Sequence, residues 1–554
     1  MNAHVSSIEI LEARIAPATL TVLNLFDFGA GTLRDTIAAS AAGDTIKFKA
    51  GLTGTLTVST GDIDIDHKLT IKGPGGNKII LNGNNSSRLF NITDGDFLTD
   101  SPVSISGLAL IHGKAGVTES GGAIFSYESL TLKNVVISGN TADNAGGVAV
   151  FGGDTLGTSV SVINCQVSGN SATDTSYGGG LDLVASKSIV ISGSTITGNK
   201  AMTKGGGVFA RVGSAGTGIT ISKSLISGNS VTASNSVGGG LAVVDENPDP
   251  ASKVQIKSSV ISGNTATASG GAGGGLYCGA GHIVLTKDSI RANTADYAGG
   301  GIEGSTADSL TMTGGSIAGN SVTNGTGGGL QVSGSGHPLT LAGVSIAGNH
   351  ASGSGGGVNL LGGFAAKLTG VVFSGNTTGS EGGGLYAGNS SSVTISGGTF
   401  AGNFSKNSGG GFVILDAASV SMMGTKISGN VSGSDAGGGY LGATGVGASI
   451  MVNGVIVAQN EASDSGGGIL FGGTAALTLK GGTFTANHAG KDGGGIFLND
   501  TLTGTISATK ITGNAANGIG GGIFNDGTAV TLASGEAAKI IGNVALTDPD
   551  RHAI

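Results

Sequence analysis

The sequence has little of what membrane spans, nucleic-acid-binding proteins and disulfide-rich proteins need. Its 554 residues include no Trp, 2 Cys and 7 Pro, and only 11% of them are charged. No apolar run reaches the roughly 18 residues of a membrane-spanning helix. The formal net charge is −8, and the scattered Lys and Arg form no basic stripe that could neutralise phosphates. We therefore expect no transmembrane segment and no nucleic-acid partner.

Motifs for metals and phosphates are missing as well. The 8 His are dispersed, and neither Lys-Ser nor Lys-Thr follows any glycine run, as a phosphate-binding loop would require. The Gly-Gly-x-Gly-x-Asp nonapeptide of calcium-binding rolls does not occur. The sequence therefore predicts no metal site and no cofactor.

Glycine, in contrast, is abundant and periodic. The chain holds 110 Gly without a Gly-X-Y period, so it is not collagen-like, and its regular apolar positions argue against disorder. A Gly-Gly-Gly run followed by an apolar residue recurs about every 27–30 residues, as a solenoid requires. The runs stand at 178–180, 205–207, 238–240, 273–275, 299–301, 327–329, 355–357, 382–384, 409–411, 437–439, 466–468, 493–495 and 520–522.

A second mark, apolar-x-Gly-Asn or a close variant, lies between successive runs. Just upstream the chain alternates apolar and polar residues, as in Val393-Thr394-Ile395, which is typical of a strand. We predict an all-β fold, a right-handed parallel β-helix, in which stacked Asn side chains form a hydrogen-bonded ladder. The Asn residues are Asn140, Asn170, Asn199, Asn229, Asn264, Asn293, Asn320, Asn349, Asn376, Asn403, Asn430, Asn460, Asn487, Asn514 and Asn543.

The chain divides into four segments. Residues 1–28 are predicted to be a leader-like or disordered segment, 29–112 the cap and first coils, 113–543 a repeat region of about 15 coils, and 544–554 a polar tail. Thr32 and Asp35 make a capping box, and Leu33, Ile37 and Ala41 share one face, so we expect a short N-terminal capping helix.

The two cysteines belong to different coils. At about 4.8 Å per coil, Cys165 and Cys278 lie too far apart for a disulfide. We expect both to be small buried residues.

Two sequence patterns resemble known β-helix proteins. Residues 32–37 and 43–46 are similar to the start of known β-helices, Ser-Leu-Arg-x-Ala-Ile followed by Gly-Asp-Thr-Ile. The repeats, with Gly-Gly-Ala-Ile at 121–124 and Phe-Ser-Gly-Asn at 373–376, resemble those of the chlamydial polymorphic outer membrane protein family. That resemblance covers the repeat region only, without a translocator barrel, and implies a bacterial, secreted or surface protein with an adhesin-like role.

Candidate ligand residues come from aligning the coils on their glycine runs. The residue after each run should point inward and the next one outward. The outward residues are Phe125, Ala149, Asp182, Phe209, Ala242, Tyr277, Glu303, Gln331, Asn359, Tyr386, Val413, Leu441, Leu470, Phe497 and Phe524. Tyr277, Glu303, Gln331, Asn359 and Tyr386 are the candidate glycan-binding residues, because rings stack on sugars while polar groups bond hydroxyls. A solvated outer strand explains the same residues.

Other features of this series bear on partners and catalysis. From Val413 onward it is apolar, which suggests a covered surface or self-association. Asp182 and Arg211 fall at different offsets, so we expect no convergent catalytic cluster and assign no catalytic residue. The loop 245–250 carries three acids that could bind calcium weakly, but we interpret it as a solvated Pro-rich loop.

The sequence favours a non-catalytic β-helix protein at the cell surface or outside the cell. It would serve as an adhesin or scaffold that contacts polysaccharides or surface proteins, by an export route that stays open. Two alternatives remain: a pectin-lyase-like polysaccharide lyase or glycoside hydrolase, and a part or paralogue of a larger autotransporter.

Overall fold

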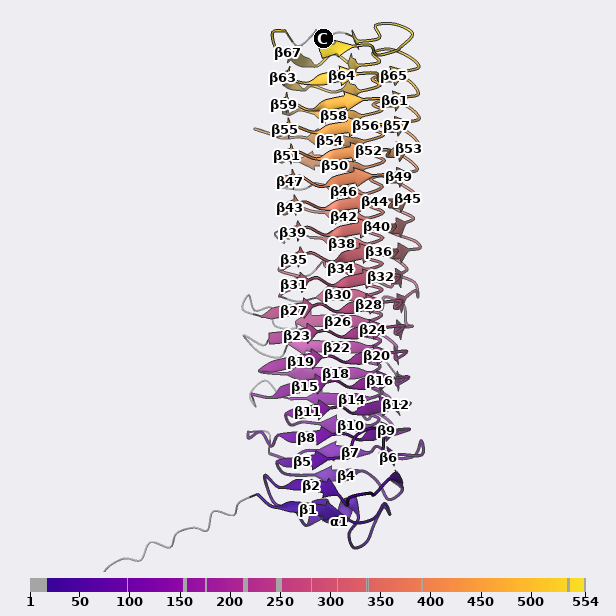
Figure 1. Ribbon diagram of the computed structural model, residues 1–554, viewed down its shortest axis with the longest axis vertical. Coiled ribbons are helices and arrows are strands. Elements are labelled where there is room, and N and C mark those ends of the chain that lie inside the picture. The colour runs from indigo at the N-terminus through magenta and orange to yellow at the C-terminus, as the bar shows by residue number, and fades with distance from the viewer. Residues whose placement is uncertain are drawn as a thin grey trace, which may run out of the picture.

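The chain winds into a long rod of stacked coils (Figure 1). The computed structural model describes residues 17–552 except for 97, 153–156, 175–176, 213–217, 246–251, 280, 306, 335, 337, 390–391 and 536–538. Four parallel sheets, A to D, run along the rod, and sheet A has 19 strands. The predicted all-β parallel β-helix is therefore confirmed.

Each full coil contributes one strand to each sheet. A representative coil contains β30 (Leu276–Gly279) in sheet C, β31 (His282–Thr286) in sheet A, β32 (Ser289–Arg291) in sheet B and β33 (Thr294–Ala295) in sheet D. Along β31, apolar side chains point inward at every second position, as expected for strands with one buried face. The inward residues of successive coils form one continuous core from the first coil to the last.

Sheet C carries the candidate site. Its strands are β4 (Ile63–Ile65), β7 (Phe90–Ile92), β10 (Ile124–Ser126), β14 (Val148–Phe151), β18 (Leu181–Ala185), β22 (Val208–Val212), β26 (Leu241–Asp245), β30, β34 (Ile302–Glu303), β38 (Leu330–Ser333), β42 (Val358–Leu361), β46 (Leu385–Gly388), β50 (Phe412–Ala417), β54 (Gly439–Ala443), β58 (Ile469–Gly473), β62 (Ile496–Leu498), β66 (Ile523–Asn525) and β69 (Arg551–His552). Sheet A runs from β1 (Thr19–Val22) to β67 (Ala529–Leu532), sheet B from β3 (Gly54–Thr57) to β68 (Ile540–Ile541), and the 14-stranded sheet D from β13 (Thr141–Ala142) to β65 (Ala515–Ala516).

The asparagines form the predicted ladder inside the rod. Asn320 is typical: its Nδ2 donates to Asn349 Oδ1 at 3.0 Å and to the Ile290 carbonyl at 3.0 Å. Its backbone N–H donates to the same Asn349 oxygen at 3.0 Å. Because each buried amide is satisfied by the coils on either side, the ladder fixes the register of neighbouring coils.

The ladder ends in the segment predicted to be a polar tail. Asp550 Oδ1 accepts hydrogen bonds from the backbone N–H and the Nδ2 of Asn543, both at 3.1 Å. β69 continues sheet C by pairing with β66. Residues 544–552 of the predicted polar tail are therefore part of the last coil, where Asp550 and β69 contact the coil before it.

The N-terminal end is closed as predicted by a short helix. α1 (Leu33–Ala38) begins at Thr32, whose side chain accepts a hydrogen bond from the Asp35 N–H, and it buries Leu33 and Ile37 in the core. It packs against β1 and β4. Within the part of the chain that is described, this six-residue helix is the only α-helix, and no helix there could span a bilayer.

The boundary predicted at residue 28 needs correction. Strand β1 lies within 1–28 and pairs in parallel with β2 (Thr45–Phe48) as the first strand of sheet A. Residues 17–28 therefore belong to the β-helix. Residues 1–16 of the predicted leader-like segment lie outside the described residues.

Successive positions of a glycine run require glycine for different reasons. Gly299 adopts a φ of +57°, where a side chain would be strained. Gly300 faces the next coil so closely that an added Cβ would lie 2.5 Å from the carbonyl oxygens of Gly328 and Ser321. The runs thus mark the places where the backbones of two coils touch.

Candidate ligand-binding face

The outward residues of sheet C form one continuous row along the rod, the outer column. Pairing along the sheet places Tyr277 beside Glu303 and Asn359 beside Tyr386, with Gln331 between the two pairs. The structure therefore brings the five predicted ligand residues together on five successive coils.

Three of these five side chains are nevertheless buried. Glu303 and Gln331 are each 5% exposed and Asn359 is 0% exposed, so only the two tyrosines present substantial surface. Gln331 Oε1 accepts hydrogen bonds from Asn359 Nδ2 at 2.6 Å and from Thr326 Oγ1 at 2.9 Å. Pointing outward from the sheet is thus not the same as facing solvent.

The centre of the row keeps two polar atoms without partners among the described residues, Glu303 Oε2 and Asn359 Oδ1. Burial raises the pKa of Glu303 to about 7, against the opposing hydrogen bonds from Ser305. Their role in ligand binding stays a prediction.

The rings of Tyr277 and Tyr386 lie along their strands, above the backbone. A Cβ added to Gly279 would be 2.7 Å from Tyr277 Cε1, and one added to Gly388 would be 3.1 Å from Tyr386 Cε1. Each ring therefore covers the glycine two residues further along, where a side chain would lift it away. This Tyr-x-Gly pattern leaves one ring face towards the backbone and the tyrosine half-buried.

A hollow opens on the same face nearer the N-terminus. Two adjoining pockets, of about 320 and 360 Å³, share Ser120 and Phe151 and together form what we call the aromatic groove. Its lining residues are Arg88, Asn91, Thr118, Glu119, Ser120, Phe125, Tyr127, Asn144, Phe151, Tyr177, Asp182, Val184, Phe209 and Arg211.

The outer column explains why the hollow is there. Ala149 and Asp182 stand between Phe125 and Phe209 on four successive strands. Two short side chains between two large ones leave space above the sheet.

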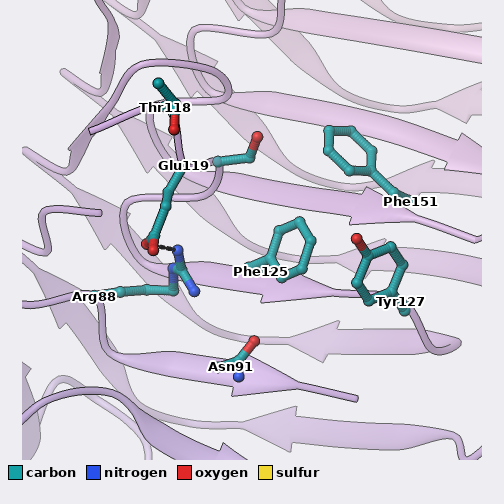
Figure 2. A pocket seen from close by; sticks show the side chains of 8 residues that line it. Arg88, Asn91, Thr118, Glu119, Phe125, Tyr127 and Phe151 are labelled. Atoms are coloured by element: carbon teal, nitrogen blue, oxygen red, sulfur yellow. Dashed lines mark hydrogen bonds and ion pairs between the residues drawn. The ribbon is translucent and has the colours of Figure 1, made fainter. Parts of the chain in front are cut away.

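One end of the groove is built around Arg88 (Figure 2). Its guanidinium donates to Asp62 at 2.9 Å, pairs with Glu119, and lies 5.4 Å from the centre of the Phe125 ring. Phe125 meets Tyr127 and Phe151 edge to face, with ring centres 4.9 and 5.7 Å apart. Because Arg88 is held between two acids and a ring, this end is a rigid aromatic surface with its charges paired.

The other end combines two rings with a buried acid. Tyr177 stacks on Phe209 with centres 4.8 Å apart, and Lys204 Nζ lies 5.1 Å from the Tyr177 ring centre. Asp182 is 2% exposed, and its Oδ1 has no hydrogen-bond partner among the described residues. Burial raises the pKa of Asp182 to about 7, while the charge of Arg211 opposes that rise.

The expectation that Asp182 and Arg211 do not converge is wrong. The register of sheet C sets Asp182 beside Phe209, and Arg211 follows two residues later on the same outer face. Their positions along their strands differ by two residues, which is the spacing of side chains on one face, so both side chains line the same pocket. The groove could have been found by comparing positions two residues apart, since Tyr127 and Phe151 also lie one step beyond the outer column.

Comparison with known proteins supports the handedness of the coil. Residues 356–543 match the family model described as "Right handed beta helix region". The chain is a right-handed β-helix repeat protein. No curated protein and no solved structure matches this β-helix, so its resemblance to the chlamydial family stays a prediction.

Towards the C-terminus of the β-helix, the predicted apolar stripe differs in one coil. Ala436 takes the positive-φ position at +61°, so the run shifts and Gly439 becomes the first inward residue. A Cβ there would lie 2.3 Å from the Phe412 ring, which fills the space. Tyr440 therefore occupies the outer column and Leu441 is buried in the core.

The other apolar side chains of this stripe are buried or pack on one another. Val413 and Leu470 are buried, Phe497 packs on Phe524 at 4.9 Å between ring centres, and His552 stacks on Phe524 at 5.2 Å. Less apolar surface is exposed than the sequence suggested. Self-association through this stripe stays a prediction.

The structure also bears on the two cysteines and the possible metal sites. Cys165 and Cys278 are buried and form no disulfide, as predicted. In the proposed calcium loop, residues 246–250 lie outside the described residues. Elsewhere, among the residues that the structure describes, no group of three or more His, Cys, Asp or Glu is placed to hold a metal ion.

Proposed function

We propose that this β-helix is a non-catalytic carbohydrate-binding protein, an adhesin or scaffold at the cell surface or outside the cell. The aromatic groove on the outer face of sheet C carries the proposal. Sugar rings present apolar C–H faces that pack on aromatic side chains, while amide and charged groups bond their hydroxyls. The groove offers Phe125, Tyr127 and Phe209 beside Asn91 and Asn144.

The shape of the β-helix supports a polymeric ligand. The groove crosses five successive strands of sheet C, from β7 to β22, and the row from Tyr277 to Tyr386 continues along the same face. An extended glycan can therefore contact several coils at once, and such repeated contacts raise affinity without a deep cavity.

The extracellular location rests on the resemblance of the repeats to a family of surface proteins. The ligand can also be a surface protein, because exposed aromatic side chains are common at protein interfaces. The groove's pairing of rings with amides favours the glycan.

A polysaccharide-cleaving enzyme is the second candidate, and Asp182 favours it. A carboxyl group whose pKa is raised to about 7 in an open pocket beside Arg211 is placed as a general acid or base would be. Glycosidases need a second carboxyl group across the scissile bond. The other acid that lines the groove, Glu119, is paired with Arg88, which favours binding over cleavage.

One experiment separates the candidates. The purified protein is incubated with neutral and acidic polysaccharides, with and without calcium, and binding and product formation are read from the same samples. We expect binding without cleavage, lost in Tyr177→Ala/Phe209→Ala and kept in the control Phe497→Ala, an outer-column ring outside the groove. Cleavage of any polymer would establish the enzyme instead, and absence of binding would reject the carbohydrate function.

A further inference from the structure

The pocket around Asp182 has a feature that restricts its ligand. Asp182 is almost fully buried, points outward from β18 into the hollow, and keeps Oδ1 without a partner among the described residues. Leaving a buried carboxylate oxygen unpaired costs free energy that a hydrogen-bond donor from a ligand would recover. Glu303 is buried to a similar degree in the same outer column but lines neither pocket of the groove, so of these two acids only Asp182 lies in the groove.

We propose that this pocket selects an uncharged sugar residue, with Asp182 accepting hydrogen bonds from its hydroxyl groups; this rests on the proposed carbohydrate function. Phe151, Val184 and Phe209 supply the apolar wall for the sugar ring. The amide of Asn144 lies at the rim and can bond further hydroxyls. The apolar wall, the amide and the carboxylate acceptor are the groups that bind an uncharged sugar with several hydroxyl groups.

An acidic sugar fits this pocket less well. A uronate or a sulfated sugar still has hydroxyl donors, but its carboxylate or sulfate group adds acceptor oxygens and a negative charge that meets the like charge of Asp182. Arg211 does not remove this conflict, because its charge already acts on Asp182. The selectivity for neutral sugars therefore depends on the negative charge of Asp182, which offsets the positive charge of Arg211.

This balance predicts a change of selectivity when the charge of Asp182 is removed. In Asp182→Asn the side chain keeps an acceptor oxygen but no charge, so the negative charge that acts on Arg211 from this position is removed. The variant should lose part of its affinity for neutral sugars and gain affinity for acidic ones. Asp182→Ala should weaken neutral binding further, because the acceptor is absent.

The test measures neutral oligosaccharides and oligouronides of equal length by isothermal titration calorimetry at pH 8, where Asp182 is ionised. We expect the natural protein to bind the neutral ligand at least about tenfold more tightly, as a hydrogen bond to a charged group supports. Asp182→Ala should weaken neutral binding about tenfold. Asp182→Asn should shift the ratio of the two affinities about tenfold towards the oligouronide. Phe497→Ala, the control outside both the groove and the row from Tyr277 to Tyr386, should leave both affinities unchanged.

The outcomes are separable. Oligouronide binding that equals or exceeds neutral binding in the natural protein would overturn the inference alone. So would neutral binding that is unchanged in Asp182→Ala but lost in Phe209→Ala. Failure of both ligand classes to bind would overturn the carbohydrate function and this inference together. If Asp182→Ala does not fold, judged by its melting curve, the near-isosteric Asp182→Asn carries the test.

Discussion

A single side chain in this rod acts according to its neighbours in the coils above and below. Ile317, in β36 (Ser316–Ala318), is fully buried and lies beside Ile290 and Ile346 of the adjacent coils. Asn320, three residues later, belongs to the ladder. Both positions recur once per coil, so the loss of one disturbs the contacts with both neighbours.

Replacing Ile317 with Asp should destabilise the middle coils by roughly 3–5 kcal/mol, because the variant buries an unpaired charge. Ile317→Val, the matched control, should cost about 1 kcal/mol. Thermal unfolding followed by circular dichroism measures both. An unchanged melting curve for Ile317→Asp would mean that the assigned coil register is incorrect.

Glycine at the contact between coils is tested in the same way. Gly300→Ala should cost roughly 1–3 kcal/mol, since the added methyl group meets two backbone carbonyl oxygens that cannot move independently. Gly218 has open space around its Cβ position and no positive φ, so Gly218→Ala should be neutral or slightly stabilising. Equal melting temperatures for the two variants would contradict the close approach.

At the scale of the strand, the outer face of sheet C carries both candidate binding regions. The aromatic groove is a hollow with rings on its walls, whereas the row from Tyr277 to Tyr386 is closed at its centre by buried Gln331 and Asn359. We therefore expect the groove to provide the main binding energy and the two tyrosines a secondary contact for a long glycan.

Replacing Tyr277 and Tyr386 together with Ala should weaken binding of long glycans roughly 30-fold, since each exposed ring face lost removes about 1 kcal/mol of contact. The fold should survive, because both rings lie on the outside of the sheet. Tyr440→Ala is the control: its ring covers Gly442 in the same way but lies outside the row. Unchanged glycan affinity in the double variant, measured by calorimetry, would reject the row as a binding surface.

The predictable part of the site follows from the repeat. The alignment of Tyr277, Glu303 and Tyr386 was predictable because the glycine runs set the register of each strand. Their burial was not, since it depends on covering side chains such as Thr326 from the preceding turn. The groove was missed because Tyr127 and Tyr177 lie outside the single series of positions considered.

For the whole molecule, buried acids make stability depend on pH. Burial raises the pKa values of Asp182 and Glu303 to about 7 and that of Asp288 to about 6. In the folded state these groups bind protons at a pH where the unfolded chain has released them. Their stabilising contribution is therefore full below about pH 4 and is lost as pH rises towards 7.

We expect the melting temperature to fall between pH 5 and pH 8 and to fall less in Asp182→Asn/Glu303→Gln. Acids with lowered pKa values, such as Asp27 and Asp44, act in the opposite direction but at lower pH, near their ordinary range. The measurement is a series of thermal melts across pH at constant ionic strength. A double variant with the same pH dependence as the natural protein would show that these two carboxyl groups do not control it.

The sequence by itself determined the parallel β-helix, the coil length, the asparagine ladder and the capping helix. These features repeat or are local, so the period of glycine, asparagine and apolar residues specifies them in each coil. Only the tertiary structure decided which outward side chains are covered, where the column is hollow, that Asp182 and Arg211 share a pocket, and that Asp550 ends the ladder. Most of these depend on side chains about 30 residues apart in sequence but one coil apart in space. The contact of Asp550 with Asn543 depends instead on how the last segment folds back onto the preceding coil.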